Sequence, residues 1–282
     1  MHEKLRKKVD KINLDVVSYD IVVYPSDDKE LKLIQYSSQE IGNYNHTADY
    51  DGVAYFNNED FNRMKQIHFK NRDFLDKIKV SKCNGYLIPF RKAIEEQQIS
   101  FEDELFHDIV KNDIYELPIE IHTKLILDKW NDFVNNYIEE DKVIIFECCL
   151  IQNPVTVSMV KNNSPKDDTM SYINSLAKTI VPLDPIIIYV EQEDIKASFN
   201  KVVCERPKEW FEGFKDYYTK QGYGLSNNLK DLDGVIQVLE ARNRLEHDVY
   251  DSLHLFKYKI DNSAFNLDFL KEKSKCIIEN HL

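Results

Sequence analysis

The chain has 282 residues, of which 43% are hydrophobic and 12% aromatic, enough for a sizeable core in one large domain or two small ones. Its formal net charge of −12 would repel a polyanion, so we expect no nucleic-acid partner. No apolar run approaches the roughly 20 residues of a membrane span and the charged start His2-Glu-Lys-Leu-Arg-Lys-Lys is no signal peptide, so we expect a cytoplasmic protein with no membrane partner.

The first half of the chain combines short strands, loops and helices. Residues 2–12 are expected to form a charged helix, and the β-branched run 15–24 a strand. A shorter strand is expected at 31–36, and helices at 59–79 and 101–110. Neither the five cysteines nor the scattered histidines have the spacing of a metal site, so we expect no metal ligands among them.

The second half alternates helices with buried strands. Apolar residues recur at helical spacing in several segments, and continuous apolar runs lie between them. We predict helices at 122–138, 165–180, 194–204, 233–253 and from 266 onward, and strands at 143–147, 186–190 and 255–260. This alternation requires crossover connections. The predicted fold class is therefore α/β, with a mainly parallel sheet covered by helices on both faces.

The strand Val143-Ile-Ile-Phe-Glu147 ends on a carboxylate. Because ligands of open α/β sheets bind just past the carboxyl ends of the strands, Glu147 is a candidate catalytic residue. The alternative is that Glu147 caps the strand and hydrogen-bonds a loop.

The order of elements in residues 122–282 resembles that of the P-loop nucleoside and nucleotide kinases, such as thymidylate kinase. The string Pro185-Ile-Ile-Ile-Tyr-Val-Glu-Gln-Glu-Asp194, followed by Lys201 and Arg206, is similar to the strand, helix and Lys/Arg stretch of these kinases. A narrower bacterial family of P-loop proteins is similar in five strings, which are 49–54, 113–118, 146–149, 151–155 and 205–210.

The resemblance implies a single α/β kinase-like domain over residues 1–282. Within it, residues 36–118 would be an insertion on the substrate side, and residues 205–230 a mobile, lid-like excursion. The expected cofactors are ATP and Mg²⁺, and the expected partner is a nucleotide or another small-molecule phosphoryl acceptor. A homodimer is a further expectation.

The chain departs from these kinases at the phosphate-binding signature G-x-x-x-x-G-K-[ST]. None of its seven glycines has that context. The sequence begins inside what resembles the first helix of the family, so we expect the first strand and the phosphate loop to be missing. Since that strand is normally central, the sheet would have a gap. The interpretation favoured here is an N-terminally shortened form of a longer protein.

The resemblance assigns roles to four residues of the second half. Glu147 would orient or deprotonate a substrate hydroxyl, or hold Mg²⁺ through water. Lys201 and Arg206, with Lys208 beside Arg206 in the lid, would neutralise charge on a transferring phosphoryl group. The alternative for the cations is that they are solvated residues near a helix end, favoured there by the helix dipole.

The substrate side would use Asp49, Tyr50 and Asp51 with Arg91 and Lys92. A tyrosine could stack on a base, an acid could bind a sugar hydroxyl, and cations could bind a phosphate. A turn around Gly52 and a surface pair explain the same residues.

Two arginines on the long helix are expected to be structural. Arg242 and Arg244 have acidic residues within one helical turn, so we predict ion pairs with Glu240, Glu246 or Asp248.

These expectations favour a nucleoside or nucleotide kinase-like phosphotransferase with little activity by itself. The alternative is a non-catalytic nucleotide-binding or protein-interaction module of the same fold.

Overall fold

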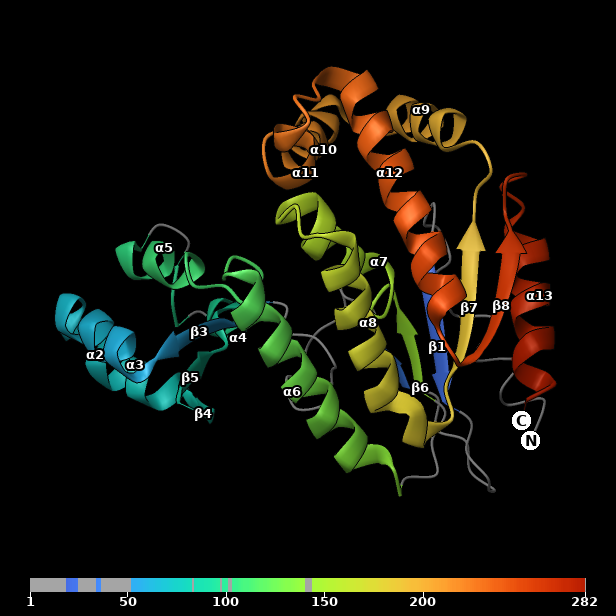
Figure 1. Cartoon of the computed structure of the whole chain (residues 1–282). Helices are drawn as coiled ribbons and strands as arrows, with labels where there is room; N and C mark the ends of the chain where they lie inside the picture. Colours follow the sequence, from blue (N-terminus) through green and yellow to red (C-terminus); the bar gives the residue numbers. More distant parts are fainter. Residues whose placement is uncertain are drawn as a thin grey trace. The chain divides into compact units, whose positions relative to one another are not determined.

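The computed structural model describes residues 19–24, 34–36, 52–82, 84–96, 98–100, 103–139 and 144–281 (Figure 1). The chain divides into two compact units. Unit 1 comprises Met1–Ser38 and Trp130–Leu282, and unit 2 comprises Gln39–Lys129. The segment predicted as an insertion, residues 36–118, overlaps most of unit 2, and its role on the substrate side stays a prediction.

Unit 1 contains a five-stranded sheet with the strand order β2-β6-β1-β7-β8. Its strands are β1 (Tyr19–Tyr24), β2 (Ile34–Tyr36), β6 (Ile144–Glu147), β7 (Ile186–Glu191) and β8 (Phe256–Asp261). β2 is parallel to β6 and β7 is parallel to β8, whereas β1 is antiparallel to both of its neighbours. Val22 of β1 lies opposite Phe146 on one side and Ile187 on the other.

The prediction of a mainly parallel sheet is therefore wrong, because the sheet is mixed. Its central position, predicted to lack a strand, is occupied by β1 between β6 and β7. The run Ile21-Val-Val-Tyr24 predicted a strand correctly but carried no information about direction. A continuous apolar run fits a central position in either orientation, since strand direction depends on where the flanking connections go.

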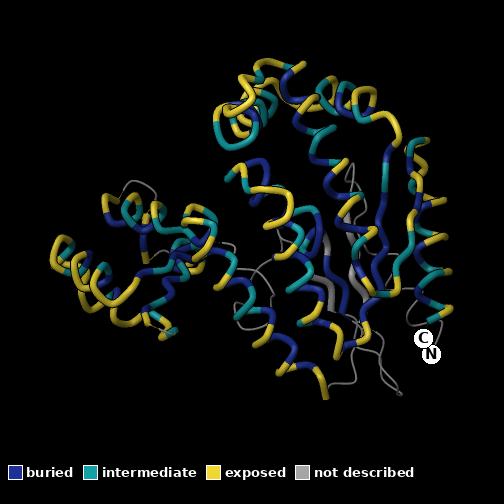
Figure 2. Tube along the Cα trace, viewed as in Figure 1, coloured by how far each residue is buried: buried dark blue, intermediate teal, exposed yellow. Residues whose placement is uncertain are grey.

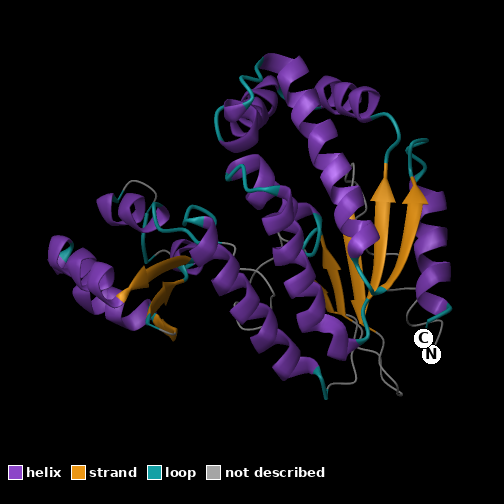
Figure 3. Ribbon diagram, viewed as in Figure 1, coloured by secondary structure: helices purple, strands orange, loops and turns teal. Residues whose placement is uncertain are grey.

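Helices cover both faces of this sheet (Figure 3). On one face, Ile186, Ile188 and Val190 of β7 form a buried cluster with residues of α13 (Leu267–Glu279). On the other face, the ring of Tyr189 lies 5.6 Å from that of Tyr250 in α12 (Asp231–Ser252). Figure 2 shows β7 as buried along almost its whole length, as expected for a strand between two layers of helices.

The aromatic side chains of α6 (Ile119–Tyr137) join the second face. The rings of Trp130 and Phe133 lie 5.4 and 5.0 Å from the ring of Phe146 in β6. The described part of unit 1 also contains α7 (Gln152–Val155), a π-helix (Thr156–Lys161), α8 (Lys166–Ile180), a 3₁₀ turn (Val181–Leu183), α9 (Ile195–Glu205), α10 (Lys208–Thr219) and α11 (Gly222–Ser226). The predicted helices at 165–180, 194–204 and 233–253 are confirmed to within two residues at each end.

The segment predicted as a lid-like excursion, residues 205–230, is largely helical, because it contains α10 and α11. Its aromatic residues form a cluster with residues of α9 and α12. Phe214 stacks on Tyr218 with ring centroids 4.2 Å apart, and Phe199 of α9 lies 5.1 Å from Phe214. The segment is thus a packed part of unit 1.

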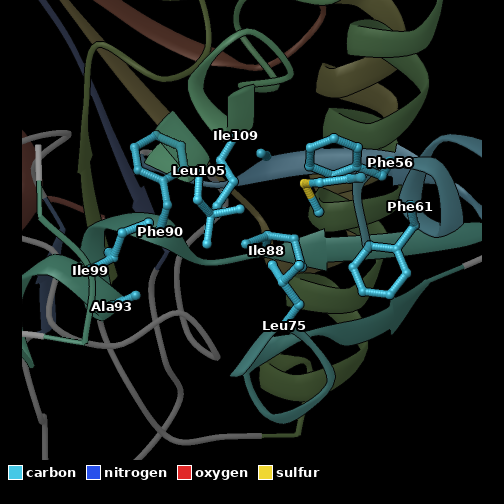
Figure 4. Packing of buried hydrophobic residues seen from close by; sticks show 11 residues of the cluster. Phe56, Phe61, Leu75, Ile88, Phe90, Ala93, Ile99, Leu105 and Ile109 are labelled. Carbon is cyan, nitrogen blue, oxygen red and sulfur yellow. The ribbon is translucent and has the colours of Figure 1, made fainter. Parts of the chain in front are cut away.

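Unit 2 has its own core (Figure 4). Its antiparallel sheet has the order β3-β5-β4, and Figure 4 shows Phe56, Leu75, Ile88 and Ile109 meeting in the core. The elements are β3 (Ala54–Asn57), α2 (Asn58–Ile67), α3 (Arg72–Ile78), β4 (Val80–Lys82), β5 (Gly85–Ile88), α4 (Phe90–Glu95) and α5 (Glu104–Val110). The one helix predicted at 59–79 is two, because a 3₁₀ turn at Phe69–Asn71 separates α2 from α3.

Within the described ranges, no helix combines the length and the apolar character needed to span a bilayer.

Replacing a glycine by alanine should have opposite effects on stability in α10 and in α11. A Cβ on Gly213, in the middle of α10, would meet no atom within 4 Å, so Gly213→Ala should raise the free energy of unfolding by about 0.5–1 kcal/mol. A Cβ on Gly222, whose φ is +40°, would lie 2.1 Å from the Val160 carbonyl oxygen. Gly222→Ala should therefore lower the free energy of unfolding by more than about 1 kcal/mol. Urea unfolding of both variants is the measurement, and equal effects would contradict the packing described for α11.

Candidate functional site

Three strands of unit 1 end on an acid at the same edge of the sheet. β6 and β7 run in the same direction, because both are antiparallel to β1, and β8 is parallel to β7. Their last residues are Glu147, Glu191 and Asp261, and Glu191 lies opposite Asp261 in the register. In Figure 1 the arrowheads of β7 and β8 point toward the end of unit 1 where α9, α10 and α11 lie. This is the edge at which the sequence predicted a site.

The chain turns sharply after Glu147. Only the backbone of Glu147 belongs to the described part of the structure. The next residue, Cys148, is buried and has a φ of +62°, which non-glycine residues adopt uncommonly. Its carbonyl oxygen accepts a hydrogen bond from the Asn153 amide at 2.9 Å, which leads the chain into α7. Such backbone conformations are concentrated at functional sites, which agrees with the position of Glu147.

The other two acids have partners that hold the fold together. The Glu191 carboxylate lies 3.2 Å from His247 Nε2 on α12 and 3.7 Å from Lys259 Nζ on β8. The Asp261 carboxylate accepts hydrogen bonds from the hydroxyl and the amide of Ser263, and these lower the pKa of Asp261. Glu191 therefore connects β7 to α12 and β8, and Asp261 stabilises the loop after β8.

The predicted catalytic cations lie on α9 and at its junction with α10. Lys201 Nζ is 3.4 Å from Glu205 Oε1 and 4.0 Å from the centre of the Phe265 ring, so Lys201 joins α9 to the loop after β8. Arg206 caps α9 through its amide, which donates to the Val202 carbonyl oxygen at 3.0 Å. The side chains of Arg206 and Lys208 are exposed, and neither forms an ion pair within the described ranges.

The predicted substrate side belongs to unit 2. Arg91 is on α4, and its amide donates to the Gly52 carbonyl oxygen at 3.1 Å. Lys92 Nζ lies 3.8 Å from Glu96 Oε1. Asp49, Tyr50 and Asp51 lie outside the described residues, so their predicted roles stay predictions.

A buried polar network that the sequence indicated only in part connects β7, α12 and α10. Arg242 Nε donates to Glu246 Oε1 at 2.8 Å, which confirms the predicted pair at helical spacing. The Tyr189 hydroxyl donates to Glu246 Oε2 at 2.8 Å, and Arg242 donates to the Tyr218 hydroxyl at 2.7 Å. All four residues are buried. Helical spacing predicted the Arg242–Glu246 ion pair, but nothing in the sequence indicated that Tyr189 and Tyr218 form hydrogen bonds with it.

The electrostatics of this network favour the charged arginine. Burial opposes the charge of the Arg242 guanidinium, but the neighbouring Glu246 carboxylate and the two tyrosines outweigh this effect and raise the pKa of Arg242 further above its usual value. A buried charge of this kind requires its partner.

Unit 2 has a second polar feature that the sequence did not indicate. His68 Nε2 lies 2.9 Å from Asp108 Oδ2, and Lys111 Nζ lies 2.8 Å from Asp108 Oδ1. Hydrogen bonds from Lys111 and His68 lower the pKa of the Asp108 carboxyl. His68 borders a depression of about 300 Å³ between residues 67–71 and 103–105.

Across the described residues, no group of three or more His, Cys, Asp or Glu side chains is arranged to hold a metal ion. The expected Mg²⁺ stays a prediction. No known protein-family model matches the chain, and no curated protein or solved structure matches it.

The Arg242–Glu246 and Lys201–Glu205 pairs have the same helical spacing but opposite exposure, which allows a matched comparison. Glu246→Gln leaves a buried guanidinium without its countercharge and should lower the free energy of unfolding by about 3–5 kcal/mol. Glu205→Gln breaks an exposed pair and should cost less than about 1 kcal/mol. Chemical unfolding monitored by circular dichroism measures both, and a small effect of Glu246→Gln would mean that the buried pair is not needed for stability.

Asp108 should make stability depend on pH at the acidic end. A carboxyl whose pKa is lower in the folded chain than in the unfolded chain stabilises the fold above its unfolded pKa, which is about 3.9. That contribution is lost as the pH falls through the lower, folded pKa. The destabilisation caused by Asp108→Asn should therefore be full at neutral pH and shrink below about pH 4.

The measurement is the midpoint of urea unfolding at several pH values, with the exposed Glu95→Gln on α4 as the control. A cost of Asp108→Asn that stays constant down to the lowest pH would show that its carboxylate contributes through packing and not through its charge.

Proposed function

We propose that the chain is a nucleoside or nucleotide kinase-like phosphotransferase domain that binds its phosphoryl acceptor but has little activity by itself. The observation that carries this proposal is the position of Glu147. It ends β6 at the edge where the carboxyl ends of β6, β7 and β8 meet, and a strained residue, Cys148, turns the chain immediately after it.

Glu147 is the acid at this edge to which we assign chemistry. Glu191 has an ion pair with Lys259, and Asp261 accepts hydrogen bonds from Ser263, so these two carboxylates already have structural partners. A carboxylate past the end of a strand is well placed to accept the proton of a substrate hydroxyl, which is the step that activates a phosphoryl acceptor.

The junction of α9 and α10 supports the binding of a phosphate group. Arg206 and Lys208 are exposed and lie on either side of Pro207, so two positive charges are close together in the sequence at this junction. Two cations next to each other suit a phosphate dianion, and an arginine can bind phosphate with two parallel hydrogen bonds. Lys201 is a weaker candidate than in the sequence-based prediction, because Glu205 and Phe265 already engage it.

The phosphoryl donor is expected to bind weakly to this chain. A glycine-rich loop supplies the backbone amides and the lysine that hold the β- and γ-phosphates, and none of the seven glycines has that context. Acceptor binding does not require that loop, so it can be tested separately from turnover.

The test is calorimetric titration of the 282-residue chain with a panel of nucleosides, nucleoside monophosphates and Mg-ATP. At least one nucleoside monophosphate should bind with a dissociation constant below about 1 mM, and Arg206→Glu with Lys208→Glu should weaken it at least about tenfold. Mg-ATP should show no micromolar binding.

The control variant is Arg244→Glu, which reverses an exposed cation on α12. Binding that is lost equally in this control would indicate an effect of net charge and not a phosphate site. Binding of no member of the panel at millimolar concentration would overturn the proposed function.

A further inference from the structure

The turn between α2 and α3 of unit 2 places two large apolar side chains in solvent. Ile67 is the last residue of α2, and Phe69 is the first residue of the 3₁₀ turn that leads into α3. Ile67 is 62% exposed and Phe69 is 60% exposed, and both border the depression of about 300 Å³ described above. In Figure 1, α2 and α3 lie together at one end of unit 2. Neighbouring apolar side chains exposed in this way indicate a contact surface.

The same part of the chain is strongly basic, although the chain as a whole is acidic. Between Phe61 and Lys82 the sequence has seven lysines and arginines and only two aspartates, whereas the whole chain has a net charge of −12. We call residues 61–82 the basic segment. Its cations are Arg63, Lys65, Lys70, Arg72, Lys77, Lys79 and Lys82. The net charge of the whole chain thus conceals a local excess of positive charge.

The acids of the basic segment leave much of this positive charge uncompensated. Asp76 forms hydrogen bonds with two lysines, Lys65 and Lys79, and the bond from Lys79 Nζ is 2.6 Å long. These bonds hold the pKa of Asp76 below its usual value, so one negative charge faces two positive ones. Lys70 and Lys77 are exposed, and neither forms an ion pair within the described residues.

An anionic phospholipid surface suits both the cations and the apolar side chains. Each Lys or Arg near such a surface strengthens binding about fivefold. Exposed isoleucine and phenylalanine side chains can be buried at the boundary between headgroups and acyl chains, which adds a hydrophobic contribution. A nucleic acid would use the cations and could stack a base on Phe69, but it would leave Ile67 in water. The two apolar side chains therefore favour lipid over nucleic acid.

The negative charge on the rest of the chain does not prevent this contact. Exposed charges more than about 8–10 Å apart are largely screened at physiological ionic strength, so the charges next to the lipid decide the interaction. Asp103 and Glu104 line the side of the depression opposite the turn. We therefore expect the lipid to meet the turn and α3, and not α5.

We propose that the basic segment of unit 2 docks on an anionic phospholipid surface. Ile67 and Phe69 insert at the level of the headgroups, and the lysines and arginines around them bind the lipid phosphates. Such docking needs no membrane-spanning helix, because only the turn between two helices enters the interface. This inference does not depend on phosphoryl transfer by the chain.

The test is co-sedimentation of the full chain with two kinds of vesicle, one of phosphatidylcholine alone and one that also contains about 30% phosphatidylserine. The chain should bind the anionic vesicles at least about tenfold more tightly than the neutral ones. Raising the salt concentration from about 0.1 to about 0.5 M should release most of the bound protein. Absence of binding to the anionic vesicles at the lower salt concentration would overturn the proposal.

The contribution of the cations is tested by Lys70→Glu with Lys77→Glu. This double variant should bind anionic vesicles at least about tenfold more weakly than the wild type. The matched control is Lys124→Glu with Lys178→Glu, which changes the net charge equally at exposed lysines on α6 and α8 and should bind nearly as the wild type does. An equal loss in both double variants would show that only net charge matters and would overturn the assigned surface.

The contribution of the apolar side chains is tested by Ile67→Ser with Phe69→Ser. This variant should bind anionic vesicles at least about tenfold more weakly, and its thermal unfolding should be that of the wild type because both side chains are mostly exposed. The matched control is Val181→Ser with Phe256→Ser on unit 1, where the side chains are 54% and 58% exposed. A loss in the control but not in the first variant would overturn the proposal.

A direct measurement of insertion uses Phe69→Trp. Its additional tryptophan emission should shift to shorter wavelength with anionic vesicles and stay unshifted with neutral ones. Fluorescence anisotropy with a single-stranded oligouridine and with a poly-glutamate peptide tests the other polyanions. If either binds more tightly than the anionic vesicles, and Ile67→Ser with Phe69→Ser leaves that binding unchanged, the basic segment binds polyanions and not lipid, and the proposal is overturned.

Discussion

The burial of β7 on both faces is the constraint that organises unit 1. Ile186, Ile188 and Val190 point toward α13, while Ile187 and Tyr189 point toward the layer that contains α12. A strand in this position must satisfy its backbone within the sheet and its side chains against helices on both sides. The neighbouring strands β1 and β8 and the helices α12 and α13 meet this requirement together.

The buried hydroxyl of Tyr189 on β7 is the start of a hydrogen-bond network that extends through unit 1. Tyr189 lies in the core, so its hydroxyl must find a partner, and it donates to Glu246. The carboxylate in turn requires a cation, which Arg242 supplies one helical turn away. The guanidinium still has donors to satisfy, and one of them reaches Tyr218. A chain of satisfied hydrogen bonds thus connects the sheet to α10, although each step is local.

The three acids at the sheet edge have different roles in the structure. Glu191 and Asp261 hold loops and neighbouring elements through ion pairs and hydrogen bonds, so acids at strand ends are not in themselves evidence of chemistry. Glu147 differs from them in its neighbour, because the left-handed Cys148 reverses the chain directly after the strand. That difference is why the proposed function rests on Glu147, with Arg206 and Lys208 as the cations for a phosphate.

The sequence by itself predicted the strands β6, β7 and β8 and the helices α8, α9, α12 and α13 of unit 1, because β6 and β7 are continuous apolar runs and these helices have apolar stripes. It did not predict α7, α10 or α11. It also determined the Arg242–Glu246 pair, since helical spacing brings these side chains together regardless of the fold. Only the tertiary structure decided the direction of β1, because an apolar run is compatible with either orientation of a central strand. It likewise decided that residues 208–226 pack as helices on α12, and that two tyrosines distant in sequence complete the buried network, since such contacts depend on how the elements fold together and leave no periodic pattern in the chain.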